Sequence, residues 1–92
     1  MNIKLLIETQ YVKNSTYRTK IVKTLDGGVK IPTQISRDVG IRTNHISKVL
    51  HDLKSKDIVI CLNENDRKGR LYKLTEKGKK INQYIKEEKK WT

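Results

Sequence analysis

The sequence predicts a small α+β domain that is mostly α-helical, with a three-helix core, a two-stranded β-hairpin and a C-terminal helix. Apolar residues recur with helical spacing before residue 57, and two short strand-like runs flank a polar turn after it. Helical spacing returns from Thr75 onward. Since 92 residues have room for one hydrophobic core, we expect a single domain over residues 1–92.

The charge balance is the strongest signal in the composition. The chain has 21 Lys and Arg residues against 10 Asp and Glu, a formal net charge of +11. Such an excess is typical of proteins that contact phosphate backbones or anionic membranes. The chain has no long apolar run and one Trp, which argues against a membrane partner. Nucleic acid is therefore favoured, both over a membrane and over a solvated lysine surface with no partner.

The N-terminal segment, residues 1–14, fits two periodicities. Four residues lie on one face of a helix, which is the interpretation that we favour: Ile3, Leu6, Ile7 and Tyr11. Read as a strand, the alternating residues are Ile3, Leu5 and Ile7. The segment lacks the apolar core and cleavage site of a secretory signal, so we expect a cytoplasmic protein.

The next helix is predicted to begin at Asn14 or Ser15, either of which can cap its first turn, and to end at Gly27 and Gly28. Its apolar stripe consists of Tyr17, Ile21, Val22 and Leu25. We expect this stripe to pack across the two helices that follow.

Those two helices surround Gly40. Pro32 is tolerated in a first helical turn, and Ile35 and Val39 form a short stripe that ends at this glycine. A longer helix is predicted over about residues 43–56. Its apolar stripe consists of Ile46, Val49, Leu50 and Leu53. The pattern is that of a helix-turn-helix, whose second helix enters the major groove of DNA, although a plain helical hairpin fits this stretch equally well.

Polar side chains, many of them hydrogen-bond donors, cover the face of residues 43–56 opposite the apolar stripe. In a helix-turn-helix, the N-terminal half of this face touches base edges. The candidates for these contacts are Thr43, Asn44, His45, Ser47 and Lys48. Further along the face, His51 is a candidate for contact with phosphate.

A β-hairpin with a basic tip is predicted after Asp57. Residues 58–62 and 71–74 form the strands, and the polar residues 63–70 join them. Three cations gather on the returning side of the tip: Arg67, Lys68 and Arg70. Charged loop residues are often merely solvated, but a basic tip after a helix-turn-helix lies where a wing contacts phosphates or the minor groove.

A final helix is predicted over residues 75–90, with Thr75 as its N-cap. Its apolar face comprises Ile81, Tyr84 and Ile85 and runs towards Trp91. Because residues 1–14 also present apolar side chains that need a partner, we expect a homodimer built through residues 1–14 and 75–90. Alternatively, both segments close the core of the monomer itself.

Three segments occur in the order PTQISRDVGIRTNHISKVLHDLKSKDIV, a charged tip ending in GRLY, and LTEKGKK. In this order they resemble the winged helix-turn-helix transcriptional regulators of the MarR and ArsR type, especially small basic archaeal forms, over residues 15 to about 90. The resemblance implies a sequence-specific regulator of transcription, which we expect to be a repressor. It also implies that residues 43–48 face the major groove of double-stranded DNA and that the wing, residues 63–70, contacts the backbone or minor groove.

The chain departs from the pattern of this family at several residues. Ile31 stands where a hydroxyl N-cap is usual, and Asp57 stands where a glycine usually ends the recognition helix. The paired cysteines and histidines of metal-sensing members are absent: the chain has Cys61, His45 and His51 only. We therefore expect no metal and no cofactor, and a buried Cys61. The sequence identifies no effector ligand.

An architectural protein that coats DNA with little sequence preference is the alternative function, because the charge alone allows it. Asn44 and Lys48 distinguish the two: Asn can bind adenine bidentately and Lys can reach guanine, whereas coating requires phosphate contacts only. The sequence shows no carboxylate pair, activated nucleophile or phosphate-binding glycine loop, so an enzyme is not expected.

Overall fold

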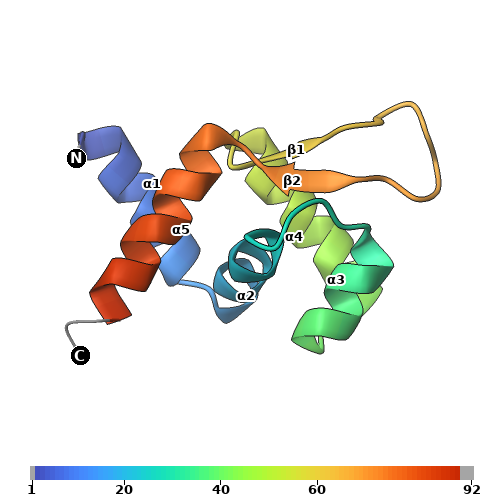
Figure 1. Cartoon of the computed structure of the whole chain (residues 1–92), viewed down its shortest axis with the longest axis horizontal. Helices are drawn as coiled ribbons and strands as arrows, with labels where there is room; N and C mark the ends of the chain where they lie inside the picture. The colour runs from blue at the N-terminus through green and yellow to red at the C-terminus, as the bar shows by residue number, and fades with distance from the viewer. Residues whose placement is uncertain (1, 90–92) are drawn as a thin grey trace.

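Helices α1 and α5 lie at one end of the molecule, and the β-hairpin and α3 lie at the other (Figure 1). The computed structural model describes residues 2–89, with side chains up to residue 87. Its elements are α1 (Ile3–Lys13), α2 (Thr16–Leu25), α3 (Pro32–Val39), α4 (Thr43–Ser55), β1 (Val59–Cys61), β2 (Tyr72–Leu74) and α5 (Glu76–Lys89). The molecule measures 39 × 24 × 19 Å. The predicted fold class is confirmed.

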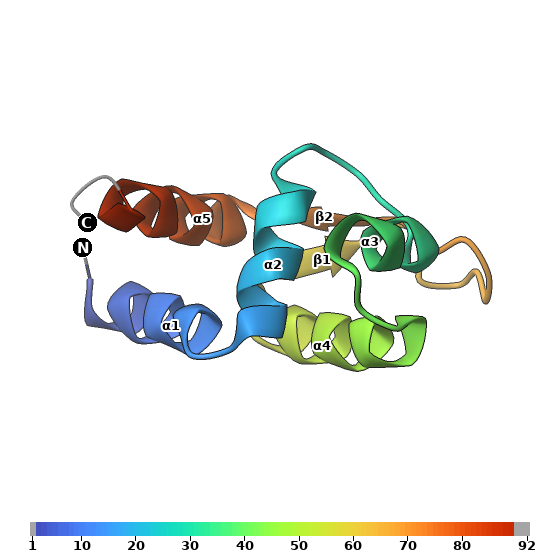
Figure 2. The same cartoon turned by 90° about the horizontal axis from the view of Figure 1, so that it is seen from below.

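The N-terminal segment is a helix, as favoured, and Asn2 caps it by accepting a hydrogen bond from the backbone N–H of Leu5 at 2.7 Å. Within the monomer, the buried side of α1 differs from the predicted apolar face, of which only Tyr11 packs against the core. The buried side consists of Leu5, Glu8, Thr9 and Val12. Ile3, Leu6 and Ile7 remain 76, 52 and 62% exposed. Since α1 packs along α5 (Figure 2), its outer apolar face is left without a partner in the monomer.

Helix α2 crosses the middle of the molecule. Ser15 caps its start, since the Ser15 Oγ accepts a hydrogen bond from the N–H of Arg18. Three members of its predicted stripe are buried: Ile21, Val22 and Leu25. The prediction was wrong for Tyr17, which is 42% exposed. Its position one helical turn before Ile21 satisfies the periodicity, but its ring lies outside the core, at the surface between α2 and α4.

The core lies between α2, α3, α4 and the inner face of the hairpin. Its fully buried side chains include Ile21, Ile35, Ile46, Leu50, Leu53 and Ile58. The hairpin is antiparallel, with Val59 opposite Leu74 and Cys61 opposite Tyr72. Each strand is three residues long, shorter than predicted. Cys61 is buried among apolar side chains, as expected.

Asp57 ends α4 in the left-handed conformation, with φ of 59°. The N–H of Asp57 bonds to the carbonyl of Lys54, and the N–H of Ile58 bonds to that of Leu53, both at 3.0 Å. A terminal glycine normally makes this pair of hydrogen bonds possible. Asp is among the residues that most readily replace glycine in this conformation, so α4 ends at the expected place.

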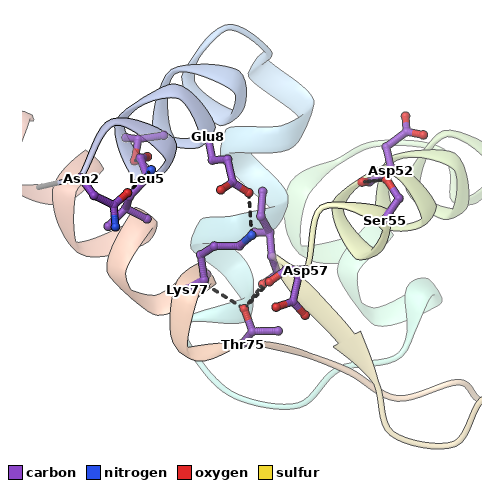
Figure 3. A network of polar contacts seen from close by, with 11 residues as sticks. Asn2, Leu5, Glu8, Asp52, Ser55, Asp57, Thr75 and Lys77 are labelled. Carbon is purple, nitrogen blue, oxygen red and sulfur yellow. Dashed lines mark hydrogen bonds and ion pairs between the residues drawn. The ribbon is translucent and has the colours of Figure 1, made fainter.

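The segment LTEKGKK joins α5 to this turn (Figure 3). The hydroxyl of Thr75 accepts a hydrogen bond from the N–H of Gly78 at 3.0 Å and donates one to the carbonyl of Asp57 at 2.7 Å. A Cβ atom on Gly78 would lie 2.2 Å from the carbonyl oxygen of Ile58. Gly78 therefore permits the close approach of α5 to the turn between α4 and β1.

Two ion pairs fasten α5 to the N-terminal helices. Lys77 Nζ lies 2.7 Å from Glu8 Oε2 of α1, and Lys86 Nζ lies 2.5 Å from Asp26 Oδ2 at the end of α2. The apolar face of α5 packs into the monomer's own core through Ile81 and Ile85, with Tyr84 half-buried. Trp91 and Lys90 lie outside the described residues. Among residues 2–89, no helix is long and apolar enough to cross a membrane.

Candidate nucleic-acid interface

A groove of about 610 Å³ separates the start of α3 and the outer side of α4 from the returning side of the hairpin. It is lined by Ile31, Pro32, Thr33, Thr43, Ser47, His51, Lys54, Arg67, Lys68, Gly69, Arg70 and Tyr72. These described residues include four cations and no carboxylate. The predicted recognition helix and the basic tip of the predicted wing thus share one concave surface. The wing and the start of α4 lie at the end of the molecule opposite α1 and α5 (Figures 1 and 2).

The predicted residues of α4 point in three directions. Thr43, Ser47 and His51, spaced by four residues, line the groove. Asn44 and Lys48 are exposed beside it without lining it. His45 turns towards α2 and makes an edge contact with the ring of Tyr17, with the ring centroids 5.8 Å apart. The single face expected from helical geometry is therefore divided between the groove, open solvent and α2.

All three predicted cations of the tip, Arg67, Lys68 and Arg70, line the groove and are exposed. Sequence reasoning missed several residues of this surface, among them Lys54 and Thr33. Lys54 follows His51 by three residues on the same helix face, so helical spacing was a signal that could have identified it. Thr33 carried no such signal, because only the packing of α3 against α4 brings it to the groove.

The two helices that border the groove begin without a side-chain cap. Ile31 precedes α3 and Arg42 precedes α4, and neither accepts a hydrogen bond from the first turn. Neither first turn contains an acidic residue. The unbonded N–H groups of a helix N-terminus carry partial positive charge and favour anions. Because Ile31 replaces the usual hydroxyl N-cap, the N-terminus of α3 is open to a phosphate group.

One ion pair connects the wing with α4. Lys54 Nζ contacts Glu64, and the hydrogen bond between them is the largest cause of a lowered pKa for Glu64 and a raised pKa for Lys54. By contrast, Arg67 and Lys68 form no ion pair with any described residue. The charge of Arg67 and Lys68 is therefore uncompensated at the surface of the groove. The described residues also contain no group of three or more His, Cys, Asp or Glu side chains suited to a metal ion.

Solved structures with the same fold include several regulators. The reduced form of the transcriptional regulator YodB from B. subtilis is 22% identical, with a TM-score of 0.80 that covers 99% of this chain and 90% of that one. A protein described as a MarR-family transcriptional regulator from Enterococcus faecalis V583 is 18% identical, with a TM-score of 0.79 and coverage of 99% and 86%. At these identities the likeness concerns the fold alone.

A third similar structure is that of NadR in complex with 4-hydroxyphenylacetate, which is 21% identical with a TM-score of 0.74. The match covers 91% of this chain but only 64% of NadR, so the chain spans less than two thirds of that relative. The comparison with curated proteins found no match. The family model described as winged helix-turn-helix matches residues 17–92, which include α2 to α5 and the hairpin. The chain therefore belongs to the winged helix-turn-helix family.

Proposed function

We propose that this protein is a sequence-specific, double-stranded DNA-binding regulator of transcription that acts in the cytoplasm as a repressor. The observation that carries the proposal is the shared groove, in which α4 and the wing present polar and cationic side chains to the same ligand. A binding role, not an enzymatic one, also agrees with the winged helix-turn-helix family. In this fold the second helix of the motif enters the major groove of DNA.

The affinity arises at the wing and at the two uncapped helix starts. Arg67, Lys68 and Arg70 neutralise phosphates or enter a narrow minor groove, and each neutralised phosphate releases condensed counterions. The N-termini of α3 and α4 add partial positive charge at Thr33 and Thr43. This contribution does not depend on sequence and weakens as salt is added.

Specificity arises on α4. Asn44 and Lys48 are the exposed side chains of its first two turns that point most directly away from the core, where base edges lie when a helix occupies the major groove. Thr43 and Ser47 face the wing side of the same helix, and His45 stands at its α2 side. His51, further from the helix start, is assigned to phosphate.

Architectural coating of DNA is the second candidate. The uncapped starts of α3 and α4 and the unpaired cations of the wing favour it, because all of them bind phosphate regardless of base sequence. The two candidate functions assign different roles to Asn44 and Lys48: a sequence-specific regulator uses them to contact base edges, whereas a coating protein needs phosphate contacts only.

The regulator acts as a homodimer. Ile3, Leu6 and Ile7 form an exposed apolar face on α1, at the end of the molecule opposite the groove. A two-fold axis through this face would leave both recognition helices free, and half-sites on successive turns of DNA lie about 34–36 Å apart. Sedimentation at micromolar protein should give twice the 10.8 kDa of the chain, and a monomer with and without DNA would contradict the dimer.

Selection of binding sites from random DNA tests the proposal. A regulator should enrich an inverted repeat, whereas an architectural protein should recover sequences uniformly. On the selected site, Asn44→Ala should lose roughly 1–3 kcal/mol of discrimination against random DNA. Arg70→Ala should weaken binding to both DNAs similarly and flatten the slope of log affinity against log salt by about one unit. If Asn44→Ala and Lys48→Ala leave the specific-to-random ratio unchanged, the assignment of α4 is wrong and coating is supported.

A further inference from the structure

We infer that Asn63 is the positioning residue of the wing: its side chain holds the loop that presents Arg67, Lys68 and Arg70. The inference rests on the proposed binding of DNA by this loop. Asn63 stands two residues after the end of β1, where the backbone pairing of the hairpin stops. The last hydrogen bond of that pairing runs from the N–H of Leu62 to the carbonyl of Leu71 at 2.8 Å.

The amide of Asn63 makes four contacts. Its Oδ1 accepts hydrogen bonds from the N–H of Leu71 at 2.7 Å and from the thiol of Cys61 at 3.7 Å. Its Nδ2 donates to Asp66 Oδ2 at 2.9 Å and to the carbonyl of Gly69 at 3.1 Å. A side-chain amide has two donor hydrogens and an oxygen with two lone pairs, so the capacity of Asn63 is filled. Rotating the amide by 180° would lose all four contacts, so the network specifies one orientation.

These partners come from both sides of the loop. Cys61 and Leu71 belong to the base of the hairpin, whereas Asp66 and Gly69 lie within the tip. A single side chain therefore ties the middle of the loop to both of its ends. The tie extends to one of the cations, because the carbonyl of Asp66 accepts a hydrogen bond from Nε of Arg70 at 2.8 Å.

The hydrogen bonds of Asn63 order the loop before it meets DNA. An eight-residue polar loop, 63–70, would otherwise have to be ordered when its cations meet phosphates, and that ordering reduces affinity. With Asn63 in place, the loop is already shaped in the free protein. Asn63 thus raises affinity without contacting DNA, and its loss should leave the number of phosphate contacts unchanged. This separates its role from that of the cations.

The chain offers a matched control, Asn65, which is the same residue type in the same loop. It is exposed and makes no side-chain hydrogen bond with a described residue. In the free protein, Asn63→Ala should remove the protection of the Leu71 amide against hydrogen exchange, and Asn65→Ala should retain it. Asn63→Asp keeps the acceptor for Leu71 but loses both donors, so it should keep this protection while loosening the tip. Equal exchange at Leu71 in the two alanine variants would overturn the inference.

Binding to a random-sequence duplex provides the second measurement. Asn63→Ala should weaken binding roughly fivefold through the added ordering, with an unchanged slope of log affinity against log salt. Arg70→Ala should flatten that slope by about one unit, and Asn65→Ala should bind like the wild type. A flattened slope for Asn63→Ala, or affinity equal to that of Asn65→Ala, contradicts the inference. If the wild type binds no duplex, the proposed function fails, while the exchange of Leu71 still decides whether Asn63 shapes the wing.

Discussion

The two ends of the molecule differ in how their cations are paired. At the helical end, formed by α1 and α5, Lys77 and Lys86 are each bonded to a carboxylate. The outside of α1 there exposes three large apolar side chains, Ile3, Leu6 and Ile7. At the groove end, formed by α3, α4 and the wing, Arg67 and Lys68 have no carboxylate partner among the described residues. Two helices there also begin without a cap.

This difference shows why the net charge of +11 does not by itself locate a binding surface. A lysine bonded to a neighbouring carboxylate attracts phosphate weakly, because the pair has little net field at a distance. An unpaired arginine beside an uncapped helix start attracts it strongly. Two unpaired cations beside two uncapped helix starts therefore favour phosphate at the groove end, and the exposed apolar face of α1 leaves the helical end suited to contact with another protein surface.

The largest effect is expected at the joint that connects the two ends. Gly78→Ala should destabilise the fold by about 3 kcal/mol, because the added Cβ meets a backbone oxygen that cannot move aside. Gly27→Ala is the matched control: its Cβ would lie 3.5 Å from the nearest atom, an ordinary contact, so the change should stay within about 0.5 kcal/mol. Urea unfolding measures both. Equal stability of the two variants would mean that α5 does not approach the turn this closely.

A second pair of variants tests the apolar surface of the helical end. Leu6 on α1 and Leu62 beside the wing are 52 and 48% exposed, so they differ in location and hardly in exposure. Leu6→Asp should raise the dissociation constant of the dimer at least about tenfold, since a carboxylate would have to be buried. Leu62→Asp should leave it unchanged. Sedimentation across a concentration series gives both constants, and dissociation by Leu62→Asp alone would place the dimer interface on the hairpin instead.

A third pair asks whether local pairing or net charge controls DNA binding. Glu64→Gln frees Lys54 in the groove and should raise the affinity for DNA by about threefold. Glu87→Gln makes the same change of charge on α5, where the side chain accepts a hydrogen bond from Gln83, and should have little effect. Titration of a labelled duplex at one salt concentration compares the variants. An equal gain from both would show that total charge, not its pairing at the groove, sets the affinity.

The smallest effect concerns pH at the helical end. The hydrogen bond from Lys86 holds the pKa of Asp26 below its usual value of 3.8. Because the folded-state pKa is lowered, the ion pair stabilises the fold above pH 3.8, and this stabilisation is lost as the pH falls through the folded value. It amounts to less than about 1 kcal/mol, since both side chains are nearly half exposed.

Urea unfolding of Lys86→Gln tests this effect. The variant should be less stable than the wild type at about pH 6, and the difference should vanish in strong acid, where Asp26 is protonated in both. Lys80→Gln removes a cation from the same helix that forms no ion pair with a described residue, and its difference from the wild type should not depend on Asp26. A pH-independent difference for Lys86→Gln would show that the ion pair does not form.

Local sequence determined most of the elements. Ser15 as a cap, Pro32 in a first turn and Gly40 as a stop act on the few residues around them, so these boundaries were predictable without knowledge of the rest of the chain. The change from helical to extended periodicity likewise predicted the hairpin and, with it, the basic tip at residues 67–70. The order of these elements was sufficient to predict the winged helix-turn-helix fold.

Only the tertiary structure decided which faces of those elements are covered. The periodicity of α1 allowed Ile3 and Ile7 to be buried, but the position of α5 buried Leu5 and Val12 instead. The same holds for the site, where the packing of α2 beside the start of α4 places Tyr17 against His45, on the side of α4 away from the groove. Helical spacing predicts which residues share a face of a helix, whereas the burial of that face depends on which distant segment packs against it. For this reason the sequence did not predict that Thr33 lines the groove. Nor did it predict the hydrogen-bond partners of Asn63, because they depend on how the loop folds back towards the base of the hairpin.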